Sequence, residues 1–246
     1  MSRILCKQCQ RPVKACICNF ICKIDNPTAV LVLQHPSEVK QTKGTVALLS
    51  RSLGHCQVLV GEDFSQHGGL NRLLENHQAL LLYPSAQSQV LSYANELEAA
   101  LISHDKKSQQ PKLLIILDGT WKKSYRMFML SSNLQALKQV CLPDSLANNG
   151  QYLIRKVAKK NALSSLEACC FALALLEDEI SENNLSVNKL EGNRLDNQLG
   201  NQLGNQAAEH TIYNREKNVD YGLYQPLLNK FAQFNQFQLS FRPSTS

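Results

Sequence analysis

Short apolar runs recur along this chain, separated by polar stretches that are long enough to form helices. Runs with the length of a strand that is buried on both faces occupy residues 29–33, 56–60, 79–83 and 113–117. Helices are expected between them at residues 44–53, where Gly54 follows as a C-terminal cap, and at residues 87–103. Buried strands that alternate with helices predict an α/β fold with a mostly parallel sheet.

The second half of the chain predicts two further helices. Ser164 and Glu167 have the spacing of a capping box, so the buried helix expected over residues 161–180 should begin near Ser164. A final helix is expected over residues 226–237, because one of its stripes is apolar. That stripe consists of Leu227, Leu228, Phe231 and Phe234. Gly68-Gly69 follows no strand and indicates a loop.

Residues 191–206 differ from the rest of the chain. The sequence Asn197-Gln198-Leu199-Gly200 repeats at once as Asn201-Gln202-Leu203-Gly204. A polar tract of such low complexity cannot bury an apolar face, and we interpret it as a disordered insertion.

Composition narrows the class of protein. The chain has 246 residues, of which 43% are hydrophobic, and this is enough for a substantial core. No apolar run reaches the length of a membrane span, and the N-terminus lacks the apolar segment of a signal peptide, so we expect a cytoplasmic protein. Thiols stay reduced there, and the nine cysteines therefore indicate metal binding or packing.

The net charge of +6 is unevenly distributed. Residues 122–160 hold eight basic side chains and only one acid, Asp144. A band of this kind suits a bound polyanion such as RNA, or it is an ordinary solvated surface, and charge alone does not decide between them.

Residues 1–24 form a cysteine-rich head in front of a body that spans residues 25–246. The head contains Cys6-x-x-Cys9 and Cys16-x-Cys18, and these paired spacings are typical of a tetrahedral zinc site. Four thiols without a nearby histidine favour a structural zinc, although Cys22 lies close enough to replace one of the four. The alternative is four unrelated thiols. Packing roles are expected for Cys56, Cys141, Cys169 and Cys170.

Polar and aromatic residues follow three of the predicted strands, and ligands bind at such strand ends in parallel sheets. The segments are Gln34-His35-Pro36-Ser37-Glu38, Tyr83-Pro84-Ser85 and Asp118-Gly119-Thr120-Trp121. Asp118 is a candidate catalytic acid or base, or only a helix cap. Trp121 could stack on a base or fill the core, and His35 could serve a ligand or only a turn. The glycine patterns of Rossmann and P-loop nucleotide sites are absent.

Taken together, these motifs resemble the DTW-domain family of tRNA-uridine aminocarboxypropyltransferases. The resemblance extends from about residue 6 to 177, and Leu117-Asp118-Gly119-Thr120-Trp121 carries the motif for which the family is named. It also includes Arg11-Pro12 among the four cysteines, Gln34-His35-Pro36 with Glu38, Thr45 with Leu48-Leu49, Tyr83-Pro84-Ser85, Tyr152-Leu153-Ile154-Arg155 and Ser164 to Ala168. The chain departs from the family at Ser165, where threonine is commoner, and in the insertion at 191–206.

The resemblance implies a knotted, SPOUT-like body that binds S-adenosylmethionine, and a zinc-bearing head. The implied cofactor-binding residues are Tyr83, Pro84, Ser85, Leu117, Gly119, Thr120, Leu153, Ser164 and Ser165. The expected reaction forms 3-(3-amino-3-carboxypropyl)uridine, in the variable loop of a tRNA, and releases methylthioadenosine. Asp118 is the expected general base, with Trp121 beside it in the catalytic loop.

We further expect the basic band to contact tRNA phosphates. Its members are Lys122, Lys123, Arg126, Arg155, Lys156, Lys159 and Lys160. Two other functions fit the same residues. One is a SPOUT-class RNA methyltransferase that uses S-adenosylmethionine, and the other is a zinc-headed RNA-binding module without catalysis.

Deletion of residues 191–206 should leave folding and catalysis intact, because this tract cannot contribute to a core. The check is to compare the deletion variant with the full chain in thermal melting and in transfer to tRNA. A variant that folds but no longer modifies tRNA would show that the tract has a function.

Overall fold

The computed structural model describes residues 4–41, 44–91, 110–147, 163–189 and 221–241. Within these ranges the chain forms one six-stranded sheet in the order β2-β1-β5-β3-β6-β4, and every pair of neighbouring strands is parallel. The strands are β1 (Ala29–Gln34), β2 (Cys56–Val60), β3 (Gln78–Leu82), β4 (Gln89–Val90), β5 (Lys112–Asp118) and β6 (Lys138–Cys141). The predicted α/β class with a mostly parallel sheet is confirmed.

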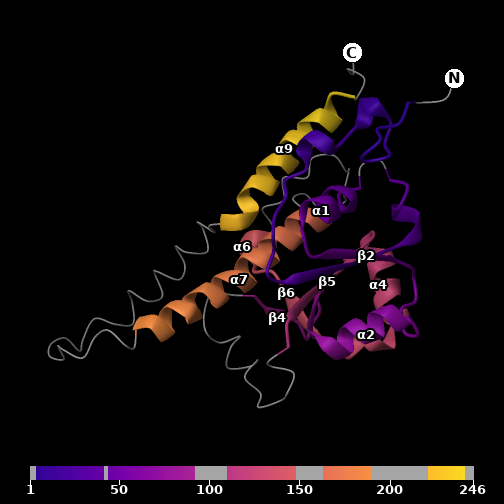
Figure 1. Ribbon diagram of the computed structural model, residues 1–246. Coiled ribbons are helices and arrows are strands. Elements are labelled where there is room, and N and C mark those ends of the chain that lie inside the picture. The colour runs from indigo at the N-terminus through magenta and orange to yellow at the C-terminus, as the bar shows by residue number, and fades with distance from the viewer. Residues whose placement is uncertain (1–3, 42–43, 92–109, 148–162, 190–220, 242–246) are drawn as a thin grey trace.

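Helices cover both faces of the sheet, as Figure 1 shows. One face packs against α1 (Val46–Ser52) and α7 (Ser165–Lys189), and the other against α2 (Gly68–Asn76), α4 (Trp121–Leu130) and α5 (Ser132–Gln135). The C-terminal helix α9 (Gln225–Leu239) joins the same core as α1 and α7. Successive side chains of a strand point to opposite faces. On β1, Val30 and Val32 therefore join the core under α7, while Leu31 and Leu33 join the core under α4. This double burial explains why β1 and β5 are apolar at almost every position.

Shorter elements complete the fold. They are α6 (Asp144–Ala147) and the 3-10 turns η1 (Val13–Ala15), η2 (Cys18–Phe20), η3 (Pro36–Glu38) and η5 (Gly222–Tyr224).

The N-terminal head packs against the C-terminal helix α9 (Figure 1). The Phe20 ring lies 5.6 Å from the ring of Phe234 and 5.3 Å from that of Phe237, centroid to centroid. Ile17 and Cys9 of the head are buried in the same core as α7 and α9. The apolar side chains of the head are therefore part of the core of the body.

Several predicted elements agree closely with the structure. The strand at residues 56–60 has the predicted bounds, and α9 contains the whole of the predicted final helix. The capping box is present at the start of α7. The Glu167 amide donates to Ser164 Oγ at 3.2 Å, and the Ser164 amide donates to Glu167 Oε2 at 2.8 Å. Of the cysteines expected in packing roles, Cys169 and Cys170 are buried.

Other predictions are wrong. Gly54 does not cap α1, because Leu53 ends that helix in an extended conformation. The Gly54 amide instead donates to the Ile24 carbonyl at 2.7 Å, and a side chain there would crowd that carbonyl. Gly68-Gly69 begins α2 and does not form a loop, because His67 Nδ1 accepts the Leu70 amide and caps the helix. Residues 87–103 were predicted to form a helix, but Gln89–Val90 form strand β4, which pairs with β6. Residues 92–109 lie outside the described residues.

No helix among the described residues combines the length and the apolar character that a bilayer span requires. The predicted insertion at 191–206 lies outside the described residues.

The half-buried carboxylate of Glu177 joins α7, η5 and the start of β1. Glu177 Oε2 accepts the Tyr224 hydroxyl at 2.6 Å, and Glu177 Oε1 accepts the Thr28 amide at 3.1 Å. Burial raises the pKa of Glu177, while these donors lower it. These hydrogen bonds therefore offset the cost of partly removing this carboxylate from water.

Tyr224→Phe should lower the free energy of unfolding by about 1–3 kcal/mol, because it removes one donor from this half-buried, charged acceptor. Chemical denaturation measures the change. Tyr125→Phe removes the same hydroxyl from an exposed ring and should cost less than about 0.5 kcal/mol. Equal stabilities for the two variants would contradict this account of the Glu177 contacts.

Candidate functional site

Two polar side chains meet where β1 and β5 end. The parallel register sets Gln34 opposite Asp118. Both residues fall on the side of their strands that faces α7. Gln34 Nε2 donates to Asp118 Oδ2 at 2.9 Å. The Asp118 carboxylate therefore stands at the carboxyl edge of the sheet, where parallel folds bind their ligands.

A second donor reaches Asp118 from the first residue of α7. Ser165 Oγ donates to Asp118 Oδ1 at 2.6 Å, so each carboxylate oxygen has one protein donor. The capping box places this contact, because it fixes the helix start one residue earlier, at Ser164. The Ser164 hydroxyl is itself engaged with the Glu167 amide. Two hydrogen bonds thus orient the carboxylate and leave each oxygen a further lone pair.

The structure decides two alternatives that the sequence left open. Asp118 is not a helix cap, because Thr120 is the N-cap residue of α4 and Asp118 is the last residue of β5. Trp121 does not fill the core, because it is 63% exposed on the first turn of α4. The exposed indole ring is available to stack on a planar ligand.

His35 serves a turn, in agreement with one of its two interpretations. Its Nδ1 accepts the Ser37 amide at 3.2 Å and caps η3. Since Nδ1 is an acceptor, the proton sits on Nε2, which lies 2.8 Å from Glu62 Oε1. Arg126 Nε lies 3.3 Å from the other oxygen of Glu62, so Glu62 links His35 to helix α4.

The segment Tyr83-Pro84-Ser85 leaves β3 at the same edge of the sheet. The ring of Tyr83 stacks on Phe128 of α4 at a centroid distance of 4.7 Å. Ser85 Oγ donates to Gln139 Oε1 at 2.5 Å, which ties the segment to β6. Among the other implied cofactor-binding residues, Leu117 is buried, Gly119 is half-buried and Thr120 is exposed; Leu153 lies outside the described residues.

Sequence analysis placed Gln34 and Glu38 in a strand-end segment and in the family resemblance without a specific role for either, and it did not single out Glu62. Glu38 is buried, and its Oε1 lies 2.9 Å from the Lys123 ammonium. A signal was present for Gln34, because it continues the α7-facing side of β1. Glu62 lies beyond the end of β2 in a loop, and its spacing carries no comparable signal.

The basic band is only partly described. Lys122 is exposed on α4, whereas Lys123 and Arg126 form ion pairs with Glu38 and Glu62. Arg155, Lys156, Lys159 and Lys160 lie outside the described residues.

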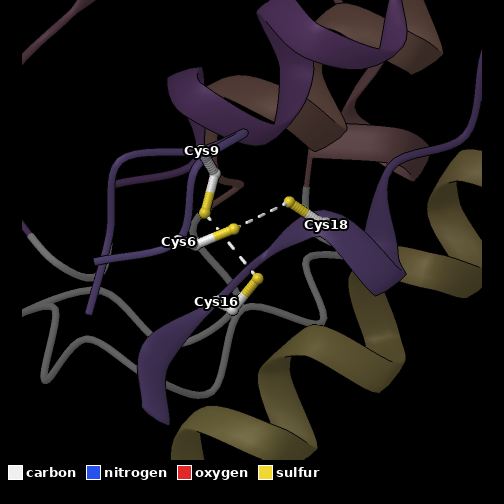
Figure 2. A group of neighbouring side chains, drawn as sticks. All are labelled: Cys6, Cys9, Cys16 and Cys18. Carbon is white, nitrogen blue, oxygen red and sulfur yellow. Dashed lines mark hydrogen bonds between the residues drawn. The ribbon is translucent and has the colours of Figure 1, made fainter. Parts of the chain in front are cut away.

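Four thiols converge in the head, as Figure 2 shows. They belong to Cys6, Cys9, Cys16 and Cys18, and all four sulfur atoms lie within 4.8 Å of one another. The sulfur atoms of Cys6 and Cys18 are 3.7 Å apart, and those of Cys9 and Cys16 are 3.8 Å apart. A tetrahedral thiolate site with metal–sulfur bonds of ~2.3 Å has edges of ~3.8 Å. The cluster could therefore hold a metal ion.

The backbone of residues 5–12 positions Cys6 and Cys9 of this cluster. Residues 5–12 form a hairpin in which the Cys6 amide donates to the Arg11 carbonyl at 2.7 Å. Gln10 closes the turn in the left-handed region, with φ 58°. Backbone hydrogen bonds from Cys9 and Gln8 lower the pKa of Cys6 to about 6. Cys22 is not part of the cluster and packs against the core.

The fold and these sites define an α/β protein with a polar strand-end site and an N-terminal four-thiol head. The DTW domain matches residues 3–239, so the chain belongs to the DTW-domain family.

The curated relatives described next are all named tRNA-uridine aminocarboxypropyltransferase. The chain is 34% identical over 178 residues to tRNA-uridine aminocarboxypropyltransferase 2 of Macaca fascicularis, which covers 70% of this chain and 56% of that relative. It is 32% identical over 179 residues to the protein of the same name in Drosophila melanogaster, which covers 70% and 66%. The Arabidopsis thaliana tRNA-uridine aminocarboxypropyltransferase A is 27% identical over 210 residues, which covers 76% and 79%. No solved structure matches the chain significantly.

The head should bind about one metal ion per chain, because four thiols complete one tetrahedral site. Cys18→Ser should lose the ion, since it removes one of the four ligands. Cys22→Ser changes a neighbouring thiol outside the cluster and should retain it. Elemental analysis of protein purified without chelators measures the ratio. Equal metal content in the two variants would contradict the assignment of ligands.

Proposed function

We propose that this protein transfers the 3-amino-3-carboxypropyl group of S-adenosylmethionine to N3 of a uridine in tRNA. The observation that carries the proposal is the Asp118 carboxylate, held by Gln34 and Ser165 at the end of β5 in a chain of the DTW-domain family. The names of the curated relatives support the same reaction.

Asp118 acts as the general base. Uracil N3 is a poor nucleophile while it carries its proton, and an oriented carboxylate can accept that proton as the new bond forms. Each oxygen of Asp118 keeps a lone pair that these two protein donors do not use. Gln34 and Ser165 are positioning residues, because each holds one oxygen of the base.

The co-substrate supplies an electrophilic carbon attached to a sulfonium. The N3–carbon bond forms as the carbon–sulfur bond breaks, and the sulfur leaves with the electron pair as neutral methylthioadenosine. Alignment of the three reacting atoms contributes the rest of the acceleration. The proposed binding residues are those at the ends of β3 and β5 and at the start of α7, with Leu153. Trp121 offers its exposed ring for stacking beside the base.

The head carries a structural zinc in this proposal. The sulfur separations fit thiolate ligands around zinc, and no imidazole is among the four ligands. Such an ion would fix the hairpin of residues 5–12 against the body. It takes no part in the transfer.

The basic band binds tRNA phosphates. Lys122 is the described member best suited to a test, because it is exposed. Replacing Lys123 would instead leave the buried Glu38 carboxylate without this partner. The proposal also retains a SPOUT-like, knotted body of residues 25–246. The parallel sheet supports the α/β class of this body.

Asp118→Asn should slow transfer by about 10²- to 10⁴-fold, because asparagine keeps the shape of the side chain but cannot accept the uracil proton. Asp25→Asn makes the same change at an exposed site and should leave the rate unchanged. The measurement is single-turnover transfer from labelled S-adenosylmethionine to unmodified tRNA, with folding checked by thermal melting.

The released product identifies the reaction class. Methylthioadenosine supports aminocarboxypropyl transfer, whereas S-adenosylhomocysteine would indicate a methyltransferase. A folded Asp118→Asn variant that transfers at the wild-type rate would remove Asp118 from the mechanism.

A further inference from the structure

Helix α4 presents a stripe of large exposed side chains to solvent. Trp121, Tyr125 and Met129 are 63%, 57% and 50% exposed. They follow one another at intervals of four residues, so they are neighbours on one face of the helix. Isolated exposed apolar residues are common on protein surfaces, whereas a continuous stripe of this kind indicates a surface that binds a partner.

Contacts on three sides hold α4 so that this stripe faces outward. On the side of β3, Phe128 stacks on Tyr83 at a centroid distance of 4.7 Å. On the side of the loop after β2, Arg126 Nε lies 3.3 Å from Glu62 Oε2. Met127 is buried beneath the helix in the core of the sheet. The two rings of the stripe are therefore carried by a fixed element and contribute little to the core.

The charge of α4 favours an anionic partner for the stripe. Its ten residues include three basic side chains and no acidic one. Lys122 is exposed beside Trp121, while Lys123 and Arg126 form ion pairs with acids of neighbouring elements. In a symmetric dimer through this face, the basic side chains of α4 would lie opposite those of the second copy. A polyanion that also offers planar groups fits both the charge and the rings.

The stripe begins next to the proposed catalytic base. Asp118 ends β5, and Trp121 lies three residues later, in the first turn of α4. Burial and the charge of Tyr125 raise the pKa of Tyr83, so Tyr125 lies near the end of β3. A uridine that reacts at N3 cannot be base-paired, because pairing uses N3. Its neighbours along the strand then belong to a loop, and RNA loops offer unstacked bases to aromatic side chains.

We propose that Trp121, Tyr125 and Met129 form a platform on which unpaired bases next to the target uridine of the tRNA stack. This inference rests on the proposed function and specifies the kind of RNA element that is bound. Trp121 would receive the base nearest to Asp118, and Tyr125 the next base along α4. Met129 extends the surface with a polarisable thioether. Stacking uses the flat face that every base has, so the platform does not read sequence.

Tyr125→Leu tests the platform, because leucine keeps an apolar, helix-forming side chain but removes the flat ring. The affinity for unmodified tRNA should fall about 5- to 100-fold, as expected for the loss of one stacked base. The slope of log K against log salt should not change, because no charge is removed. Single-turnover transfer at saturating tRNA should keep the wild-type rate, since Tyr125 lies one turn away from the catalytic loop.

Two matched variants separate stacking from other effects. Tyr125→Phe keeps the ring and should keep the affinity for tRNA. Phe241→Leu removes a ring that is 53% exposed at the end of the chain segment after α9, and it should also leave the affinity unchanged. Thermal melting confirms that each variant is folded.

The platform also carries its own spectroscopic probe, because Trp121 is the only tryptophan of the chain. A short single-stranded oligouridylate should quench the fluorescence of Trp121 by stacking on it. An RNA duplex of the same length should quench it much less, because its bases are already stacked on one another. Tyr125→Leu should raise the oligouridylate concentration that gives half of the quenching.

The outcomes separate this inference from the proposed function. An unchanged tRNA affinity in folded Tyr125→Leu, or an equal loss in Tyr125→Phe, would overturn the platform alone. A wild-type dimer that becomes monomeric in Tyr125→Leu would overturn it by assigning this face to a second copy. Loss of S-adenosylmethionine binding in that variant would overturn it by assigning the ring to the co-substrate. If the quenching and the affinities behave as expected but the wild-type protein transfers nothing, the platform stands and the proposed reaction fails.

Discussion

The site depends on the parallel register between β1 and β5. That register sets Gln34 beside Asp118 and turns both side chains toward α7, where Ser165 completes the carboxylate's contacts. A slip of one residue would turn one of the two polar groups toward α4, because side chains alternate along a strand. The alternating apolar residues of both strands belong to two separate cores, and their burial prevents such a slip.

Much of the architecture could be predicted because it is local. Apolar runs marked the long strands, and the Ser164–Glu167 spacing located the start of α7. The four cysteines were identified by their paired spacing. Errors arose where a local rule met a competing contact. His67 caps α2, so the two glycines that follow it begin a helix. The close approach of the Ile24 carbonyl explains why position 54 is a glycine.

The contacts around Asp118 could not be predicted in the same way. Gln34, Asp118 and Ser165 are far apart in the sequence, and only strand order and register bring them together. The same holds for the Lys123–Glu38 pair, which joins α4 to η3. Charge counts identified a basic band, yet two of its described members are paired with acids, and their fields at the surface are correspondingly weaker.

The contact of Phe20 with Phe234 and Phe237 has a consequence for the order of folding. A ribosome releases the head well before α9, so the apolar side of the head stays uncovered while the residues between them are made. Local hairpin contacts can form early, but the packing of the head on α9 must wait until that helix is made. The nascent chain therefore passes through a stage in which its sheet can assemble while the head and α9 are still separate.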